Sequence, residues 1–134
     1  MNNSVPGSCQ CGAVRFEAPL PSLWCAHCHC ADCRKAHGAG YVTWAGFKES
    51  TVRFAGAESP LHWRHSSETA ERGFCRACGS TMFYRSTRWP GELHIAVGVL
   101  DGAIDKAPQV NVYVDEAVDW VALDDALSGR GPNA

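Results

Sequence analysis

Eight cysteines, most of them in C-x-C or C-x-x-C spacings, are the residues of this sequence best suited to do chemistry. At such spacings neighbouring thiolates converge on one metal ion more readily than they form disulfides across a fold. The first residues carry neither a basic segment nor an apolar one, so we expect no secretory signal and a cytoplasmic location. Disulfides do not persist in that reducing compartment. The cysteines are therefore predicted to bind metal.

Two cysteine pairs are far apart in the sequence but complement each other. Cys9 and Cys11 lie two residues apart, so on a strand both side chains point to one face. Cys75 and Cys78 form a C-x-x-C pair followed by glycine, as in a zinc knuckle. A redox C-x-x-C pair would precede a long helix, whereas Thr81–Tyr84 favours a strand. Together the four cysteines predict a closed, tetrahedral structural zinc site.

A second cluster, Cys28, Cys30 and Cys33, supplies three ligands within a short segment. Three protein ligands and one open position are typical of a zinc ion that does chemistry. Cys25 could act as a fourth ligand and close the site, which would make it structural. Strand parity puts Cys25 and Cys28 on opposite faces and favours the open site, although a β-bulge would restore closure.

Alternating apolar and polar residues, interrupted at short intervals by Gly and Pro, predict many short strands. Only Ala31–His37, ended by Gly38, is compatible with a helical turn. We predict one all-β, mainly antiparallel domain over residues 1–134, with its core at about 7–127 and a frayed tail at Ser128–Ala134. The alternating runs lie at 14–17, 52–54, 61–63, 93–97 and 110–114.

Charge and hydropathy exclude several classes of partner. The net charge of −2 and the lack of a basic extension argue against nucleic-acid binding. No run of about 18 apolar residues is present, so we expect no transmembrane helix and no membrane partner. Hydrophobic residues make up 46% of the chain, which is ordinary for a globular protein.

Three segments together resemble the glutathione-dependent formaldehyde-activating enzyme family, which shares its domain with centromere protein V. Two late segments, at 98–101 and 120–125, are also similar to it, so the resemblance spans roughly residues 7–127. The three segments are Gly7-Ser8-Cys9-Gln10-Cys11-Gly12-Ala13-Val14, Cys28-His29-Cys30-x-x-Cys33-Arg34 and Glu71-Arg72-Gly73-Phe74-Cys75-x-x-Cys78-Gly79-Ser80.

The resemblance implies a zinc-stabilised β-tent fold with one structural and one catalytic zinc ion. It implies that Cys28, Cys30 and Cys33 hold the catalytic ion. The reaction implied is condensation of glutathione with formaldehyde to S-hydroxymethylglutathione, classed in reverse as a carbon–sulfur lyase activity. The other four cysteines, Cys9, Cys11, Cys75 and Cys78, would hold the structural ion.

Substrate contacts are less well defined. Glutathione is anionic, so basic residues beside the cysteine motifs are candidate carboxylate partners, although solvated surface positions fit each one equally well. His37 is a candidate proton donor or extra ligand, but a solvated histidine at a turn is the stronger expectation. His27 and His29 share the face of Cys25 and are weak ligand candidates. The basic candidates are Arg34, Lys35, Arg72 and Arg76.

Three functions are compatible with these motifs, because metal ligands and fold glycines do not report the substrate. The first is an enzyme or carrier for glutathione and a small aldehyde. The second is a related carbon–sulfur activity on another thiol. The third is a zinc-stabilised binding module. The group that would protonate the product alkoxide is open between water, His37 and Glu71.

Overall fold

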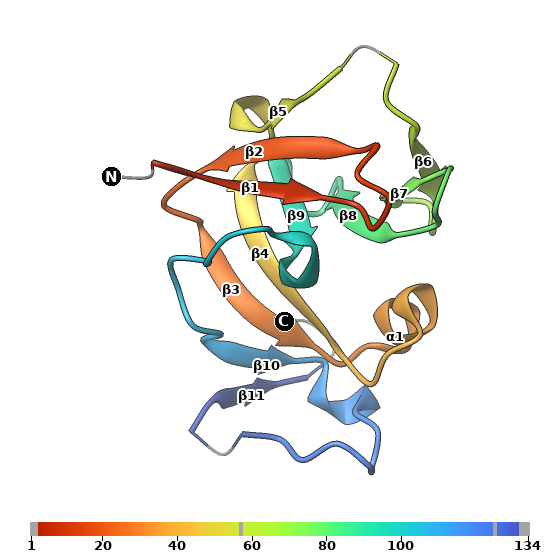
Figure 1. Cartoon of the computed structure of the whole chain (residues 1–134). Coiled ribbons are helices and arrows are strands. Elements are labelled where there is room, and N and C mark those ends of the chain that lie inside the picture. The colour runs from red at the N-terminus through yellow and green to blue at the C-terminus, as the bar shows by residue number, and fades with distance from the viewer. Residues whose placement is uncertain (1–2, 57, 125, 132–134) are drawn as a thin grey trace.

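The computed structural model describes residues 3–56, 58–124 and 126–131 (Figure 1). Short strands dominate, as predicted, and the described part contains no helix long and apolar enough to cross a membrane. The elements are β1 (Ser4–Ser8), β2 (Arg15–Pro19), β3 (Trp24–Cys28), α1 (Ala31–His37), β4 (Val42–Lys48), η1 (Glu49–Thr51), β5 (Arg53–Phe54), β6 (Leu61–His65), β7 (Ala70–Cys75), β8 (Thr81–Ser86), β9 (Glu92–Ala96), η2 (Val97–Val99), β10 (Val110–Val112), η3 (Val114–Glu116) and β11 (Ser128–Arg130).

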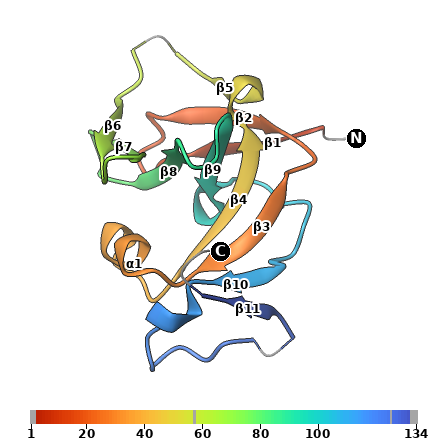
Figure 2. The same cartoon turned by 180° about the vertical axis from the view of Figure 1, so that it is seen from behind.

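The strands form two sheets. The larger one has the order β11-β10-β3-β4-β9-β8-β7-β6, and the smaller one has the order β1-β2-β5. Strand β10 pairs in parallel with both β3 and β11, and the other strand pairs are antiparallel. Figures 1 and 2 show β1 and β2 crossing one end of β4 and β9, while α1 follows the opposite end of β3. The prediction of a mainly antiparallel all-β fold is confirmed.

The single helix begins and ends where the sequence predicts. Cys30 is the N-cap of α1, and its Sγ accepts a hydrogen bond from the Cys33 N–H. Gly38 ends the helix with φ of 62°, a left-handed conformation that glycine adopts without steric cost, and its N–H donates to the Arg34 carbonyl. This helix therefore holds two cysteines of the second cluster in a fixed relation.

The C-terminal segment differs from the prediction. Ser128–Arg130, expected to be frayed, form β11 and pair in parallel with β10. The physical reason is that β10, only three residues long, pairs with β3 along one edge. Without β11 its other edge would be left unpaired. Residues 132–134 lie outside the described part of the chain.

The main core lies between the two sheets. Phe16 of β2 packs edge-on against Phe83 of β8, with ring centroids 5.2 Å apart, and Phe54 of β5 approaches the same ring at 5.5 Å. Leu93 and Ile95 of β9 are fully buried beside them. Each such side chain contributes about 1.5–3 kcal/mol of burial free energy. The alternating apolar residues at 93–97 thus mark a strand whose odd-numbered residues, Leu93 and Ile95, face the core.

The opposite face of the larger sheet carries a row of directly paired residues across five strands. The register pairs Trp24 with Gly46, Gly46 with His94, His94 with Tyr84, and Tyr84 with Arg72. A Cβ atom at Gly46 would lie 2.4 Å from the Trp24 Nε1 atom. Glycine at this position therefore lets the Trp24 indole lie across β4 toward β9.

We expect Gly46→Ala to destabilise the protein by about 1–3 kcal/mol, because the added methyl group must displace the indole. Urea unfolding followed by circular dichroism measures the change. Gly98→Ala is the matched control, since a Cβ there meets nothing within 4 Å. Equal stability of the two variants would contradict the close approach.

Candidate functional site

The four-cysteine cluster, Cys9, Cys11, Cys75 and Cys78, joins the turn after β1 to the turn after β7. Its sulfur atoms all lie within 4.8 Å of one another. Cys9 Sγ is 3.6 Å from Cys11 Sγ, which is 3.8 Å from Cys75 Sγ. The structure thus brings together the four residues predicted as one closed site, and four soft sulfur ligands suit Zn²⁺.

Hydrogen bonds favour the ionised form of two thiols of this cluster, Cys9 and Cys78, whereas the hydrogen bond with Cys9 raises the pKa of Cys11 to about 11. The Val14 N–H donates to Cys9 Sγ at 3.2 Å, and Ser80 Oγ lies 3.2 Å from Cys78 Sγ. These contacts with Ser80 lower the pKa of Cys78 to about 5. Because metal binding needs thiolates, the hydrogen bonds to Cys9 and Cys78 support the role that the spacing of the cluster predicts.

The three-cysteine cluster, Cys28, Cys30 and Cys33, lies at the junction of β3 and α1. Its sulfur atoms are again within 4.8 Å of one another, with Cys28 Sγ 3.5 Å from Cys30 Sγ. Cys28 and Cys33 are buried, and Cys30 is half-buried. The cluster offers three convergent ligands, so its donor set also fits Zn²⁺, with one position left for another ligand.

Arg72 of β7 contacts this cluster directly. Its side chain is 3% exposed, and its two terminal nitrogens donate to Cys33 Sγ at 3.7 and 3.6 Å. The guanidinium also lies over the Tyr84 ring, 5.0 Å from the centroid. Hydrogen bonds with Cys28 and Cys30, together with Arg72, lower the pKa of Cys33 to about 3. In this structure Arg72 therefore supports a sulfur ligand, whereas the sequence suggested a contact to substrate carboxylate.

Cys25 lies apart from the cluster, as strand parity predicts. It pairs with Ala45 on β4, whereas Cys28 pairs with Val42, so the two cysteines point to opposite faces. Cys25 is buried, and desolvation raises the pKa of its thiol. Its backbone N–H donates to the Gln109 side chain. A neutral thiol at this position fills the core, and the geometry leaves the three-cysteine cluster open.

A cavity of about 720 Å³ adjoins the three-cysteine cluster. Its floor is the face of the larger sheet that carries the paired row from Trp24 to Arg72. The segment between β6 and β7 borders it, as does the segment between β8 and β9, where Arg88 lies over the Trp89 ring at 4.7 Å. The cysteine cluster therefore faces a volume large enough for a small peptide-like ligand.

Acidic and aromatic residues line the part of the cavity formed by β3 and β9. Glu92 Oε1 accepts hydrogen bonds from Trp24 Nε1 at 3.1 Å and from His94 Nε2 at 3.0 Å. Burial lowers the pKa of His94, so its ring is neutral near pH 7 and donates from Nε2. Sequence reasoning missed this group. The alternation at 93–97 contained the signal, because Glu92 and His94 must face away from the buried Leu93 and Ile95.

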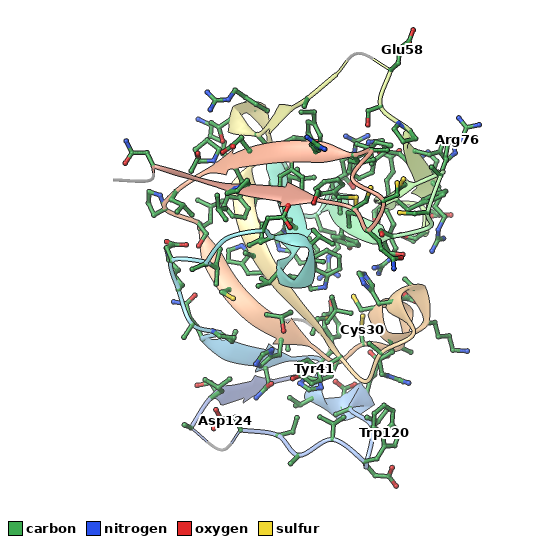
Figure 3. All side chains as sticks on the ribbon, in the orientation of Figure 1. Cys30, Tyr41, Glu58, Arg76, Trp120 and Asp124 are labelled. Carbon is green, nitrogen blue, oxygen red and sulfur yellow. The ribbon has the colours of Figure 1, made fainter. Side chains whose placement is uncertain are left out.

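The other predicted substrate contacts lie elsewhere. Arg34 and Lys35 project from α1 and do not line the cavity. Arg76 is exposed at the end of β7, far from Cys30 in Figure 3. Glu71 forms an ion pair with Arg85, 3.1 Å between Oε1 and Nε, and also lies outside the lining. The cavity thus draws most of its polar groups from segments that the cysteine motifs do not mark.

His37 is not the solvated turn residue that the sequence favoured. Its ring is half-buried and packs edge-on against Trp44, with centroids 5.3 Å apart. Its Nε2 is buried without a hydrogen-bond partner among the described residues. Desolvation, helped by the nearby positive charge of Arg72, lowers the pKa of His37 to about 4. The weak candidates His27 and His29 pack on Tyr41, on the face away from the cavity.

The fold and the site define a class: a β-sheet protein with one cluster of four cysteines and one of three, each able to hold a metal ion, the second facing a cavity. Residues 4–116 match the family described as glutathione-dependent formaldehyde-activating enzyme. The chain belongs to that family.

Known proteins with similar sequences or structures include the following three. A protein of Halomonas elongata, whose name carries the same family description, is 31% identical over 94% of this chain and 85% of its own length. An uncharacterized lyase of Schizosaccharomyces pombe is 26% identical over 84% of this chain and 80% of its own. A crystal structure of a Rhodobacter sphaeroides protein has a TM-score of 0.62 and 28% identity, and the match covers 75% of this chain and 91% of that one.

We expect Cys75→Ser to leave the chain unfolded or aggregated. A zinc ion held by these four sulfur atoms would link segments far apart in sequence, and a structural zinc is worth roughly 10–16 kcal/mol in small model systems. That is comparable with the net stability of a domain, about 5–15 kcal/mol. Circular dichroism and zinc analysis check the result, and a folded, soluble variant with full zinc content would contradict it.

The lowered pKa of His37 predicts that the protein loses stability at acid pH. Because its folded pKa lies below the ordinary value of 6.5, the stability it contributes is present above pH 6.5 and is lost as the pH falls toward 4. Relative to His37→Gln, the wild type should lose about 2 kcal/mol of unfolding free energy between about pH 7 and pH 5. Urea titrations at both pH values, with zinc content monitored, measure the difference. Parallel losses in the two proteins would show that His37 titrates normally.

Proposed function

We propose that this protein holds zinc at both cysteine clusters and joins glutathione to formaldehyde at the three-cysteine cluster. The observation that carries the proposal is the open arrangement of Cys28, Cys30 and Cys33 beside a cavity of about 720 Å³. Membership of the family supports the same substrates. The reverse reaction is that of a carbon–sulfur lyase, and the cytoplasm is the expected location.

The residues around the cavity have two roles: some would hold the zinc ion or support its ligands, and others would bind the substrate. Cys28, Cys30 and Cys33 would hold the zinc ion, which when bound stabilises a substrate thiolate and polarises an aldehyde oxygen. Arg72 holds Cys33 in its ionised form through two N–H donors. The guanidinium also lies over the Tyr84 ring, which favours its position. The strand face from Trp24 to Tyr84 would receive the rest of the thiol substrate.

The bond changes balance without a further reactant. The thiol gives up its proton, the sulfur forms a bond to the aldehyde carbon, and the carbonyl π electrons move to oxygen, which takes a proton. The product is the hydroxymethyl thioether. Of the two named proton-source candidates, Glu71 is engaged by Arg85 and His37 lies outside the cavity lining, so we assign this proton to water.

The test combines zinc content, ligand binding and turnover in the wild type and in Cys30→Ser. Serine keeps a good N-cap for α1, so the variant should fold. We expect zinc to fall from two ions per chain to one, and glutathione binding by calorimetry to be lost. Exchange NMR with ¹³C-formaldehyde should show faster formation of the adduct with wild type than without protein, and no acceleration with the variant.

Other outcomes separate the alternatives. Glutathione binding without acceleration would indicate a carrier. One zinc ion in both proteins, with no glutathione binding to either, would indicate a zinc-stabilised binding module and would contradict the proposal. Adduct formation that is faster with a different thiol than with glutathione would assign the chain to the related carbon–sulfur activity.

A further inference from the structure

The part of the cavity that β3 and β9 form contains an unusual carboxylate. One oxygen of Glu92 accepts from both Trp24 Nε1 and His94 Nε2, and both side chains line the cavity with it. Two neutral N–H groups orient the carboxylate but leave its charge uncompensated. The second oxygen of Glu92 has no hydrogen bond among the described residues. The Glu92 side chain is 28% exposed, so this charge is accessible from the cavity.

The basic residues near Glu92 are engaged elsewhere or project into solvent. Lys48 is its register partner on β4, but that side chain is exposed and forms none of the ion pairs found among the described residues. Arg85 pairs with Glu49 and Glu71. Arg88 lies over Trp89 and donates to the Tyr113 hydroxyl at 3.4 Å. Within the described part of the chain, Glu92 therefore has no cationic partner.

Aromatic rings surround this end of the cavity. The ring of His94 lies 4.6 Å from that of Trp24 and 5.5 Å from those of Tyr84 and Trp89. The close fit of the Trp24 indole over Gly46 fixes one of these walls. Aromatic faces beside an unpaired carboxylate form the environment that attracts an organic cation, because the ring quadrupole and the negative charge act together.

We propose that Glu92, with Trp24 and Trp89, binds the ammonium group of the thiol substrate while the sulfur lies at the three-cysteine cluster. The paired row connects the two ends: Arg72 contacts Cys33, Tyr84 lies beside Arg72, and His94 lies beside Tyr84. The substrate class is a small thiol with a primary amine at the end remote from its sulfur. Glutathione meets that description, so this inference rests on the proposed function at the sulfur end.

The test compares glutathione with its desamino analogue, in which hydrogen replaces the amino group. The wild type should bind glutathione about tenfold more tightly, equivalent to about 1.4 kcal/mol. In Glu92→Gln the two affinities should become nearly equal, because the amide keeps both N–H···O bonds and loses only the charge. Glu58→Gln is the matched control, since it removes the same charge from a site far from Cys30 in Figure 3. Calorimetry gives the affinities, and zinc analysis confirms that both clusters stay loaded.

Four results would overturn the inference, and they are distinguishable. If the wild type binds neither thiol, the proposed function fails and the inference fails with it. If it binds both equally, or if Glu92→Gln keeps the tenfold preference, only the inference fails. Should Glu92→Gln not fold, Trp89→Leu decides, because Trp89 lies between β8 and β9 and outside both strands. The preference for the amine should fall several-fold in that variant. An unchanged preference would show that Trp89 does not contribute to binding the ammonium group.

Discussion

The convergence of thiolates is the constraint on which the rest of this structure depends. Sulfur atoms 3.5–3.8 Å apart repel each other once ionised, so each cluster needs positive charge close by. The four-cysteine cluster joins the end of β1 to the end of β7 and so links the smaller sheet to the larger one. At the three-cysteine cluster, buried Arg72 supplies one positive charge from within the chain. The two clusters thus have different electrostatic support, consistent with a structural role for one and a chemical role for the other.

The register of the larger sheet connects the three-cysteine cluster to the far end of the cavity. Arg72 of β7 reaches Cys33 because α1 lies close to the neighbouring strand β8, where the Thr81 hydroxyl donates to the Ala36 carbonyl. The same row continues through Tyr84 and His94 to Gly46 and ends at Trp24. One face of the sheet therefore joins the sulfur cluster to the carboxylate of Glu92. The sheet forms the floor of the cavity, and the segments between β6 and β7 and between β8 and β9 border it.

Local patterns allowed much of the fold to be predicted. Alternation identified the strands around Phe16, Phe54 and Ile95, and Gly38 marked the end of the helix, because periods and caps are local properties. Cysteine spacing predicted which sulfur atoms converge, since ligands of one ion must lie close together. Strand parity placed Cys25 away from Cys28.

Properties that depend on tertiary pairing could not be predicted in this way. The parallel pairing of β11 with β10 joins segments with no shared local pattern. The burial of His37 depends on Trp44 of a different element, and the role of Arg72 depends on a helix far away in sequence. Motif proximity therefore suggested Arg34, Lys35 and Arg76 as substrate contacts, while the cavity lining comes from many elements that lie far apart in the sequence.

Zinc-edge X-ray absorption of the two-zinc protein, before and after addition of glutathione, tests the central claim most directly. An open three-cysteine cluster predicts, summed over the two ions, seven sulfur ligands and one light-atom ligand, as the four and three cysteines of the two clusters require. Glutathione should replace that light atom with sulfur. A shell that is all sulfur before the thiol is added, or a mixed shell that glutathione leaves unchanged, would contradict the account.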